Sequence, residues 1–113
     1  MKIVFVASKF ASIYEIEIRR YASKDDKIII NQADAIDFIS AERLRSNGYK
    51  ISVYSPNYER YGKAAPEKIV DGADKIIFVD NGASQVTRNI MAYADEKGVP
   101  LKLILRPLVI NFH

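Results

Sequence analysis

The fold is decided by the stretch KIIFVDNGASQVTR, residues 75–88. Its apolar run, Ile76 to Val79, predicts a strand that is covered on both faces, as in a parallel sheet. The run leads into Asn81-Gly82, a turn signal, and the residues after the turn have the spacing of a helix. A buried strand, a short loop and a helix make one unit of an α/β fold.

The same pattern recurs along the whole chain. Strands are predicted at about 2–7, 27–31, 49–54, 75–80 and 100–105. Helices are predicted at about 12–22, from Asp34 to Asn47, from Pro66 to Gly72 and from Ser84 to Gly98. We therefore predict one α/β domain over residues 1–113, with a Rossmann-like parallel five-stranded sheet of order 3-2-1-4-5 and helices on both faces.

The spacing of apolar residues also predicts which helical side chains face the sheet. In the first helix these are Ile13, Ile16 and Tyr21. In the second, Asp34 is expected to cap the N-terminus, and the apolar face comprises Ile36, Phe38, Ile39, Ala41 and Leu44. The third helix is expected to bury Ile69 and Val70, and the fourth Val86, Ile90, Met91 and Ala94.

The composition is that of an ordinary globular domain. The chain has 113 residues, of which 49% are hydrophobic and 27% charged, and its net charge of +3 mildly favours anionic partners. No apolar run approaches the roughly 20 residues that span a bilayer. With no secretion signal and no cysteine, we expect a cytoplasmic protein without membrane contact. A homo-oligomer is expected, and the tail 107–113 could cover a sheet edge, swap a strand or contact another subunit.

Parallel α/β sheets bind ligands beyond the carboxyl ends of their strands, where helix N-termini offer unpaired N–H groups. The loops after the first, second and fourth predicted strands meet this condition. The candidate ligand-binding residues in these loops are Ser8 and Lys9 after the first strand, Gln32 after the second, and Asn81, Gly82, Ser84, Thr87 and Arg88 after the fourth.

The loop after the fourth strand is the strongest of these candidates. Gly82 permits a tight turn, and Ser84 and Thr87 supply hydroxyl groups beside a helix N-terminus. Arg88 falls on the first turn of that helix, where a cation is unfavourable unless an anion offsets it. These features are typical of a phosphate site, although an ordinary turn with Ser84 as a helix cap accounts for the same residues.

A tyrosine-containing segment, residues 58–63, could close over the same edge. Tyr61, together with Tyr58, offers a ring on which a nucleic-acid base could stack. The alternative is that both rings pack against the domain. For Ser8 and Lys9, likewise, anion binding competes with a capping serine and a solvated lysine.

Common catalytic arrangements are missing from the sequence. It has no cysteine, its one histidine is His113, and neither GxGxxG nor GxxxxGK[ST] occurs. We therefore expect no catalytic triad, no metal site and no cofactor. Asp34, Asp37 and Asp80 lie near the predicted edge and could act as acid, base or nucleophile, or serve as cap and turn residues.

Several stretches resemble the YspA/YpsA-related branch of the SLOG superfamily. They are residues 58–65, 70–80, 84–89 and 96–102, and include RYGKAA and ADKIIFVD. The resemblance covers about the C-terminal half of the chain, and it implies a Rossmann-like domain that binds a nucleotide or a nucleotide-derived ligand. The superfamily also includes the DNA-processing protein DprA and the cytokinin-releasing LOG enzymes.

The N-terminal half matches that family more loosely. Ala7-Ser8-Lys9 is found where the family tends to carry Gly-Ser-Arg, residues 32–37 lack the glycines of its second loop, and Val86 replaces a glycine. Side chains at these places hinder close approach of a phosphate to the backbone. The LOG motif PGGxGTxxE is absent, so the resemblance does not imply the phosphoribohydrolase activity of those enzymes.

Three functions follow from these observations. The first is a binding module for a nucleotide or another phosphorylated small molecule. The second is an enzyme that cleaves an N-glycosidic bond of a nucleotide with one of the three aspartates. The third is an accessory protein of the DprA type that binds single-stranded nucleic acid.

Overall fold

Five parallel strands form one sheet in the order β3-β2-β1-β4-β5. The computed structural model describes residues 1–8, 11–31, 35–54, 66–82 and 85–106. Within these ranges the strands are β1 (Lys2–Ala7), β2 (Lys27–Asn31), β3 (Lys50–Tyr54), β4 (Lys75–Asp80) and β5 (Leu101–Leu105). The helices are α1 (Glu15–Tyr21), α2 (Phe38–Ser46), α4 (Pro66–Val70) and α5 (Gln85–Glu96). The predicted fold class and strand order are therefore confirmed.

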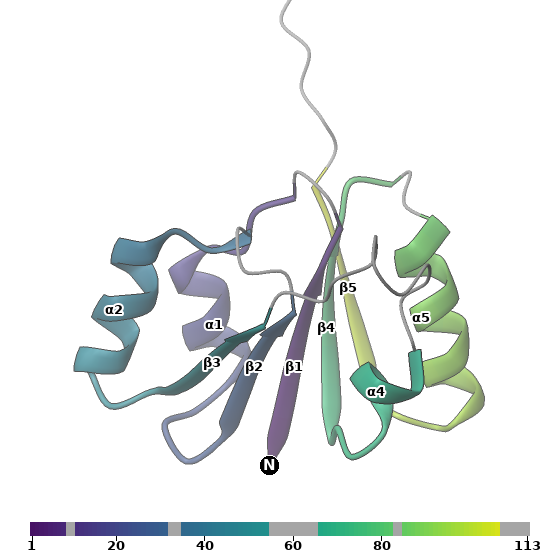
Figure 1. Cartoon of the computed structure of the whole chain (residues 1–113), viewed down its shortest axis with the longest axis horizontal. Helices are drawn as coiled ribbons and strands as arrows, with labels where there is room; N and C mark the ends of the chain where they lie inside the picture. The colour runs from purple at the N-terminus through teal and green to yellow at the C-terminus, as the bar shows by residue number, and fades with distance from the viewer. Residues whose placement is uncertain (9–10, 32–34, 55–65, 83–84, 107–113) are drawn as a thin grey trace, which may run out of the picture.

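Helices cover both faces of the sheet, and each face has its own apolar core. Phe5 of β1 belongs to the core shared with α1 and α2, whereas its neighbours Val4 and Val6 belong to the core shared with α4 and α5. This alternation follows from the two-residue period of a strand. In Figure 1, α1 and α2 lie to the left of the sheet centre and α4 and α5 to the right. We call the two sides the α1/α2 face and the α4/α5 face.

The first helix begins three residues later than predicted and presents a different side to the sheet. Ile16 was expected inside but is 63% exposed, whereas Ile18 is fully buried and Glu17 is nearly so. The start is set by Glu17, whose carboxylate accepts the Tyr14 backbone N–H at 2.9 Å. This contact between Glu17 and the residue before the helix fixes the rotation of the short helix.

The second helix also begins later than predicted and presents a different side to the sheet. Asp34, the predicted cap, lies outside the described residues, and Asp37 caps α2 instead. Phe38 and Ile39 therefore lie on the outer side and are 77% and 67% exposed. Only Ala41 and Leu44 face inward from α2, and Ile36 is buried ahead of it.

The third and fourth predicted helices agree better with the structure. Ile69 and Val70 of α4 are buried as expected, as are Ile90 and Ala94 of α5. Met91 is half-buried. The prediction for Val86 was wrong, because Val86 is 44% exposed while Thr87 is buried. The inward positions of α5 are Thr87, Ile90 and Ala94, which follow the spacing of one helical stripe.

No described helix is long and apolar enough to cross a membrane.

Candidate functional site

The direction of chain progression reverses between β1 and β4, since β2 and β3 follow β1 on one side while β4 and β5 lie on the other. The carboxyl ends of these strands lie at the top of the sheet in Figure 1. There the Ser8 N–H donates to Val79 O at 2.9 Å, and the Asn81 N–H donates to Ser8 Oγ at 3.1 Å. The structure thus brings the predicted residues Ser8 and Asn81 together at the place where open α/β sheets bind ligands.

Buried polar side chains are concentrated at this edge. The buried polar or charged residues among those described are Ser8, Glu17, Asn31, Asp80 and Thr87. Strand alternation places Asn31, Asp80 and Ser8 on the α4/α5 face, because they continue the rows of Ile29, Phe78 and Val6. Thr87 points to the same face from α5, along with Ile90 and Ala94. We call Ser8, Asn31, Asp80 and Thr87 the polar cluster.

Asp80 is the most telling member of the polar cluster. Its side chain is 4% exposed, and in the part of the chain that the structure describes, Oδ1 has no hydrogen-bond partner. The Asp80 backbone oxygen accepts the Arg106 N–H at 2.7 Å. Buried polar atoms are nearly always hydrogen-bonded, and exceptions often mark functional sites. Of the two predicted aspartates that the structure describes, Asp37 is exposed and only Asp80 is buried.

The start of α5 lies directly after this strand. Gly82 has φ +90°, a left-handed conformation that favours glycine, and its carbonyl oxygen accepts Arg88 Nη2 at 2.8 Å. The first turn of α5 carries no acidic residue, so the helix itself supplies no carboxylate to the positive end of its dipole. Arg88 is exposed, and its remaining guanidinium N–H groups can serve a bound anion. Thr87, in contrast, is buried beneath the helix.

A hollow adjoins the polar cluster on the α4/α5 face. It is lined by Lys2 and Val4 of β1, Ile29 and Asn31 of β2, and Lys68 and Ile69 of α4. Its empty volume of about 260 Å³ includes the solvent at its open mouth, so it is a shallow hollow in the surface. Asn31 belongs to both the hollow and the polar cluster. Sequence reasoning placed Asn31 in the candidate loop after the second strand but chose Gln32 as the ligand-binding residue, although a polar residue at the end of the apolar run KIIIN was a usable signal.

Arg106 forms a second polar group at the same edge, on the α1/α2 face. It donates from Nε to Ser12 O at 2.9 Å, pairs with the Glu17 carboxylate, and lies 4.2 Å from the Tyr14 ring centroid. Glu17 also accepts the Tyr14 N–H. Every charge in this group has a partner, so it joins the end of β5 to the start of α1. The sequence offered no signal for it, because Arg106 and Glu17 are 89 residues apart.

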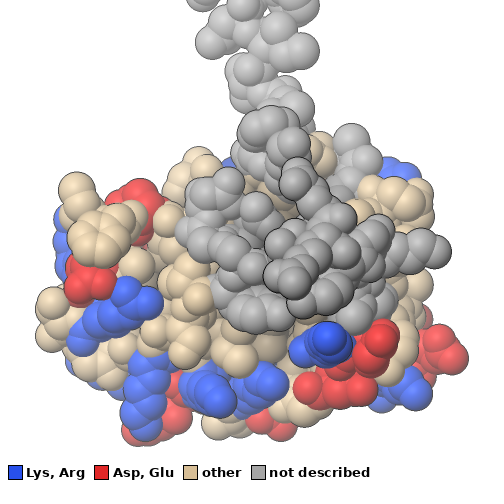
Figure 2. Space-filling model, viewed as in Figure 1, with Lys and Arg blue, Asp and Glu red and all other residues tan. Residues whose placement is uncertain are grey.

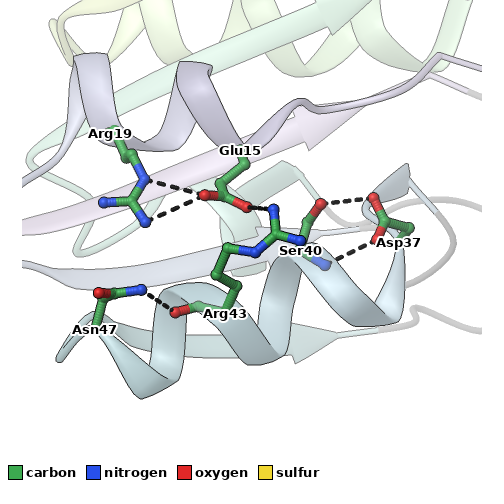
Figure 3. A network of polar contacts seen from close by, with 6 residues as sticks. All are labelled: Glu15, Arg19, Asp37, Ser40, Arg43 and Asn47. Carbon is green, nitrogen blue, oxygen red and sulfur yellow. Dashed lines mark hydrogen bonds and ion pairs between the residues drawn. The ribbon is translucent and has the colours of Figure 1, made fainter.

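Asp37 is engaged in holding its helix. Figure 3 shows that its carboxylate accepts two hydrogen bonds from Ser40, one from the backbone N–H at 2.8 Å and one from the hydroxyl at 2.7 Å. These hydrogen bonds, that of the hydroxyl first, hold the pKa of Asp37 below its usual value. In the same view Glu15 of α1 binds Arg19 and also Arg43 of α2, at 3.1 and 2.9 Å. Asp37 thus serves as the cap that was its alternative interpretation.

The other predicted site residues lie outside the described ranges; they are Lys9, Gln32, Asp34, Tyr61 and Ser84. Among the residues that the structure does describe, no group of three His, Cys, Asp or Glu side chains could hold a metal ion. Comparisons of the chain with protein-family models, with curated proteins and with solved structures find no match.

Proposed function

We propose that the chain binds a nucleotide or a nucleotide-derived phosphorylated small molecule at the carboxyl edge, on the α4/α5 face. The observation that carries the proposal is Asp80, a buried carboxylate whose Oδ1 has no partner in the described part of the chain. It immediately precedes the loop that leads to the start of α5 and Arg88. An acceptor and an anion-favouring helix end are thus next to each other along the chain.

Asp80 and the start of α5 would contact different parts of one ligand. The helix N-terminus and Arg88 favour an anion such as a phosphate. Asp80 repels an anion but accepts hydrogen bonds from hydroxyl or amino groups. A nucleotide offers both, with its phosphate and its ribose hydroxyls or base amino group. The sequence resemblance to SLOG proteins supports the same ligand class.

Thermal denaturation with a panel of ligands tests the proposal. Nucleoside mono- and diphosphates, ADP-ribose, inorganic phosphate and free nucleosides are compared. At a concentration of 100 times its Kd, a true ligand adds about 2.7 kcal/mol to the unfolding free energy, which raises the melting temperature. We expect the largest rise for a compound that combines phosphate with ribose or base.

Two variants locate the binding site. Arg88→Ala and Asp80→Asn should each remove most of the ligand-induced rise, whereas Arg20→Ala, an exposed arginine on α1, should keep it. A rise that both site variants retain in full would place the ligand elsewhere. The absence of a rise with every phosphorylated compound would end the proposal.

A second candidate function is cleavage of the N-glycosidic bond of such a nucleotide. Asp80 favours it, because hydrolysis of glycosidic bonds relies on carboxylates held in buried surroundings. Release of free base from nucleoside monophosphates, detected by chromatography, would support catalysis if Asp80→Asn abolished it. Release that is unaffected by Asp80→Asn would exclude this carboxylate as the catalytic group.

A further inference from the structure

The strand β5 lies at one edge of the sheet, and β4 is its only partner among the described strands. Figure 1 shows it as the yellow strand to the right of β4. The carbonyl of Pro100 and the N–H of Arg106 are hydrogen-bonded to β4, so the alternate residues between them also direct their main-chain groups to β4. The residues that direct theirs away from the sheet are Leu101, Leu103 and Leu105. This outer edge is a template on which another strand can pair.

The same three leucines leave an apolar stripe exposed on the α4/α5 face. Leu103 is 37% and Leu105 62% exposed, and both share that face with Leu101, which packs against its core. The other edge strand, β3, exposes the polar residues Lys50 and Ser52. Edge strands usually carry charges that discourage pairing. An exposed apolar stripe beside unpaired main-chain groups marks β5 as an interaction surface.

The sequence of β5, LKLIL, is complementary to itself when two copies run antiparallel. A two-fold axis through Leu103, perpendicular to the sheet, places Leu103 opposite its own copy and Leu101 opposite the partner's Leu105. Lys102 then lies opposite the partner's Ile104. Directly opposed residues of an antiparallel pair share one face of the sheet, so the leucines of the two copies form one continuous stripe.

The neighbouring registers bring positive charges together. An axis through Lys102 places the two copies of that lysine opposite each other, and an axis through Ile104 places Lys102 opposite the partner's Arg106. Like charges on directly opposed positions are destabilising. An axis between two residues would oppose side chains of different faces, because the period of a strand is two. Charge therefore favours the register that is centred on Leu103.

We infer that two copies of the chain associate through β5, antiparallel and centred on Leu103, so that their sheets join into one. A two-fold contact uses the same patch on both copies, which the self-complementary sequence satisfies. Figure 2 shows basic side chains interspersed with acidic ones along the lower edge of the molecule, a pattern that favours solubility over a charged partner. The inference does not depend on the proposed nucleotide site.

Light scattering coupled to gel filtration tests the association. The chain should have twice its single-chain mass of 12.8 kDa, and Leu103→Lys should halve the measured mass, because it opposes two like charges at the axis. Ile39→Lys is the matched control, since Ile39 is 67% exposed, like Leu105, but lies on α2, far from β5 in Figure 1. It should leave the mass unchanged.

Single cysteines test the register, because the chain has no cysteine of its own. Hydrogen-bonded antiparallel partners have Cα atoms about 5.5 Å apart, within reach of a disulfide. Leu103→Cys should therefore form a disulfide-linked dimer under mild oxidation. In Lys102→Cys the two cysteines lie two residues out of register, with Cα atoms about 8 Å apart, so little dimer should be linked.

Four results would overturn the inference. They are a single-chain mass at every concentration tested, a dimer that survives Leu103→Lys, an equal loss of mass with Ile39→Lys, and linkage of Lys102→Cys in preference to Leu103→Cys. A dimer that survives Leu103→Lys would show that another surface or an exchanged segment joins the copies. Melting curves check that each variant is folded.

Discussion

Two buried carboxylates at the carboxyl edge of the sheet have opposite surroundings. Glu17, on the α1/α2 face, is 8% exposed and is held by Arg106 and by the Tyr14 N–H. Asp80, on the α4/α5 face, is 4% exposed, and its Oδ1 has no partner among the described residues. Similar burial therefore accompanies complete pairing on one face and incomplete pairing on the other.

The difference separates a carboxylate with a structural role from one that we propose to contact a ligand. Burial of a carboxylate is unfavourable unless hydrogen bonds and an opposite charge offset it. The Glu17 group meets that condition and connects β5 to α1. Asp80 Oδ1 has no such partner within the described part of the chain. Proteins tolerate such groups mainly at functional sites, where a ligand supplies the missing partner.

The largest expected change in the free energy of unfolding comes from breaking the Glu17–Arg106 pair on the α1/α2 face. Arg106→Ala leaves the Glu17 carboxylate buried without its counter-charge, and should lower the free energy of unfolding by about 3 kcal/mol. Urea denaturation measures the change. The control is Arg43→Ala, which breaks an exposed pair with Glu15 and should cost less than about 1 kcal/mol. Equal losses for the two variants would show that the Glu17 group is no stronger than a surface pair.

Neutralising each carboxylate in turn should change stability in opposite directions. Glu17→Gln weakens the contact with Arg106 and should lower the free energy of unfolding by about 1–2 kcal/mol. Asp80→Asn removes a buried carboxylate whose Oδ1 has no partner among the described residues, and should raise it by about 0.5–1 kcal/mol in the absence of ligand. Urea denaturation at neutral pH gives both values. A loss of stability in both variants would contradict the contrast between the two faces.

The smallest expected effect concerns Asp37, an exposed carboxylate that is well paired. Its folded-state pKa lies below the unfolded value, so its contribution is present above the unfolded pKa of about 4 and is lost as pH falls through the folded pKa. Asp37→Asn should therefore flatten the acid side of the stability profile below about pH 4. Asp25→Asn is the control, because Asp25 is also an exposed aspartate. A profile that changes equally in both variants would refute the assignment.

The sequence predicted the framework well and the helix rotations poorly. Apolar runs such as Ile76 to Val79 identify strands, because a strand covered on both faces needs no alternation. Helix rotation depends on where the cap lies, and a cap at Asp37 instead of Asp34 turned Phe38 and Ile39 outward. The cap lies three residues beyond the predicted one, so Phe38 and Ile39 fall in the first turn of α2 on its outer side, while Ala41 and Leu44 face inward as expected.

The candidate site was predicted in part. Strand-end rules led to Ser8, Asn81 and Asp80, and the structure places all three at the reversal between β1 and β4. The Glu17–Arg106 pair was not predicted, because it depends on a contact between distant parts of the chain. Only the structure showed that Thr87 points inward from α5.

The sequence by itself determined the α/β class, the five strands and the edge at which a site would form. These depend on local apolar runs and turn residues, and on the general rule that ligands bind at the carboxyl ends of parallel strands. Only the tertiary structure showed that Glu17 pairs with Arg106 and that Asp80 Oδ1 has no partner among the described residues. Pairing is set by distances between side chains far apart in sequence, so it becomes visible only when the sheet brings β1, β4 and β5 together.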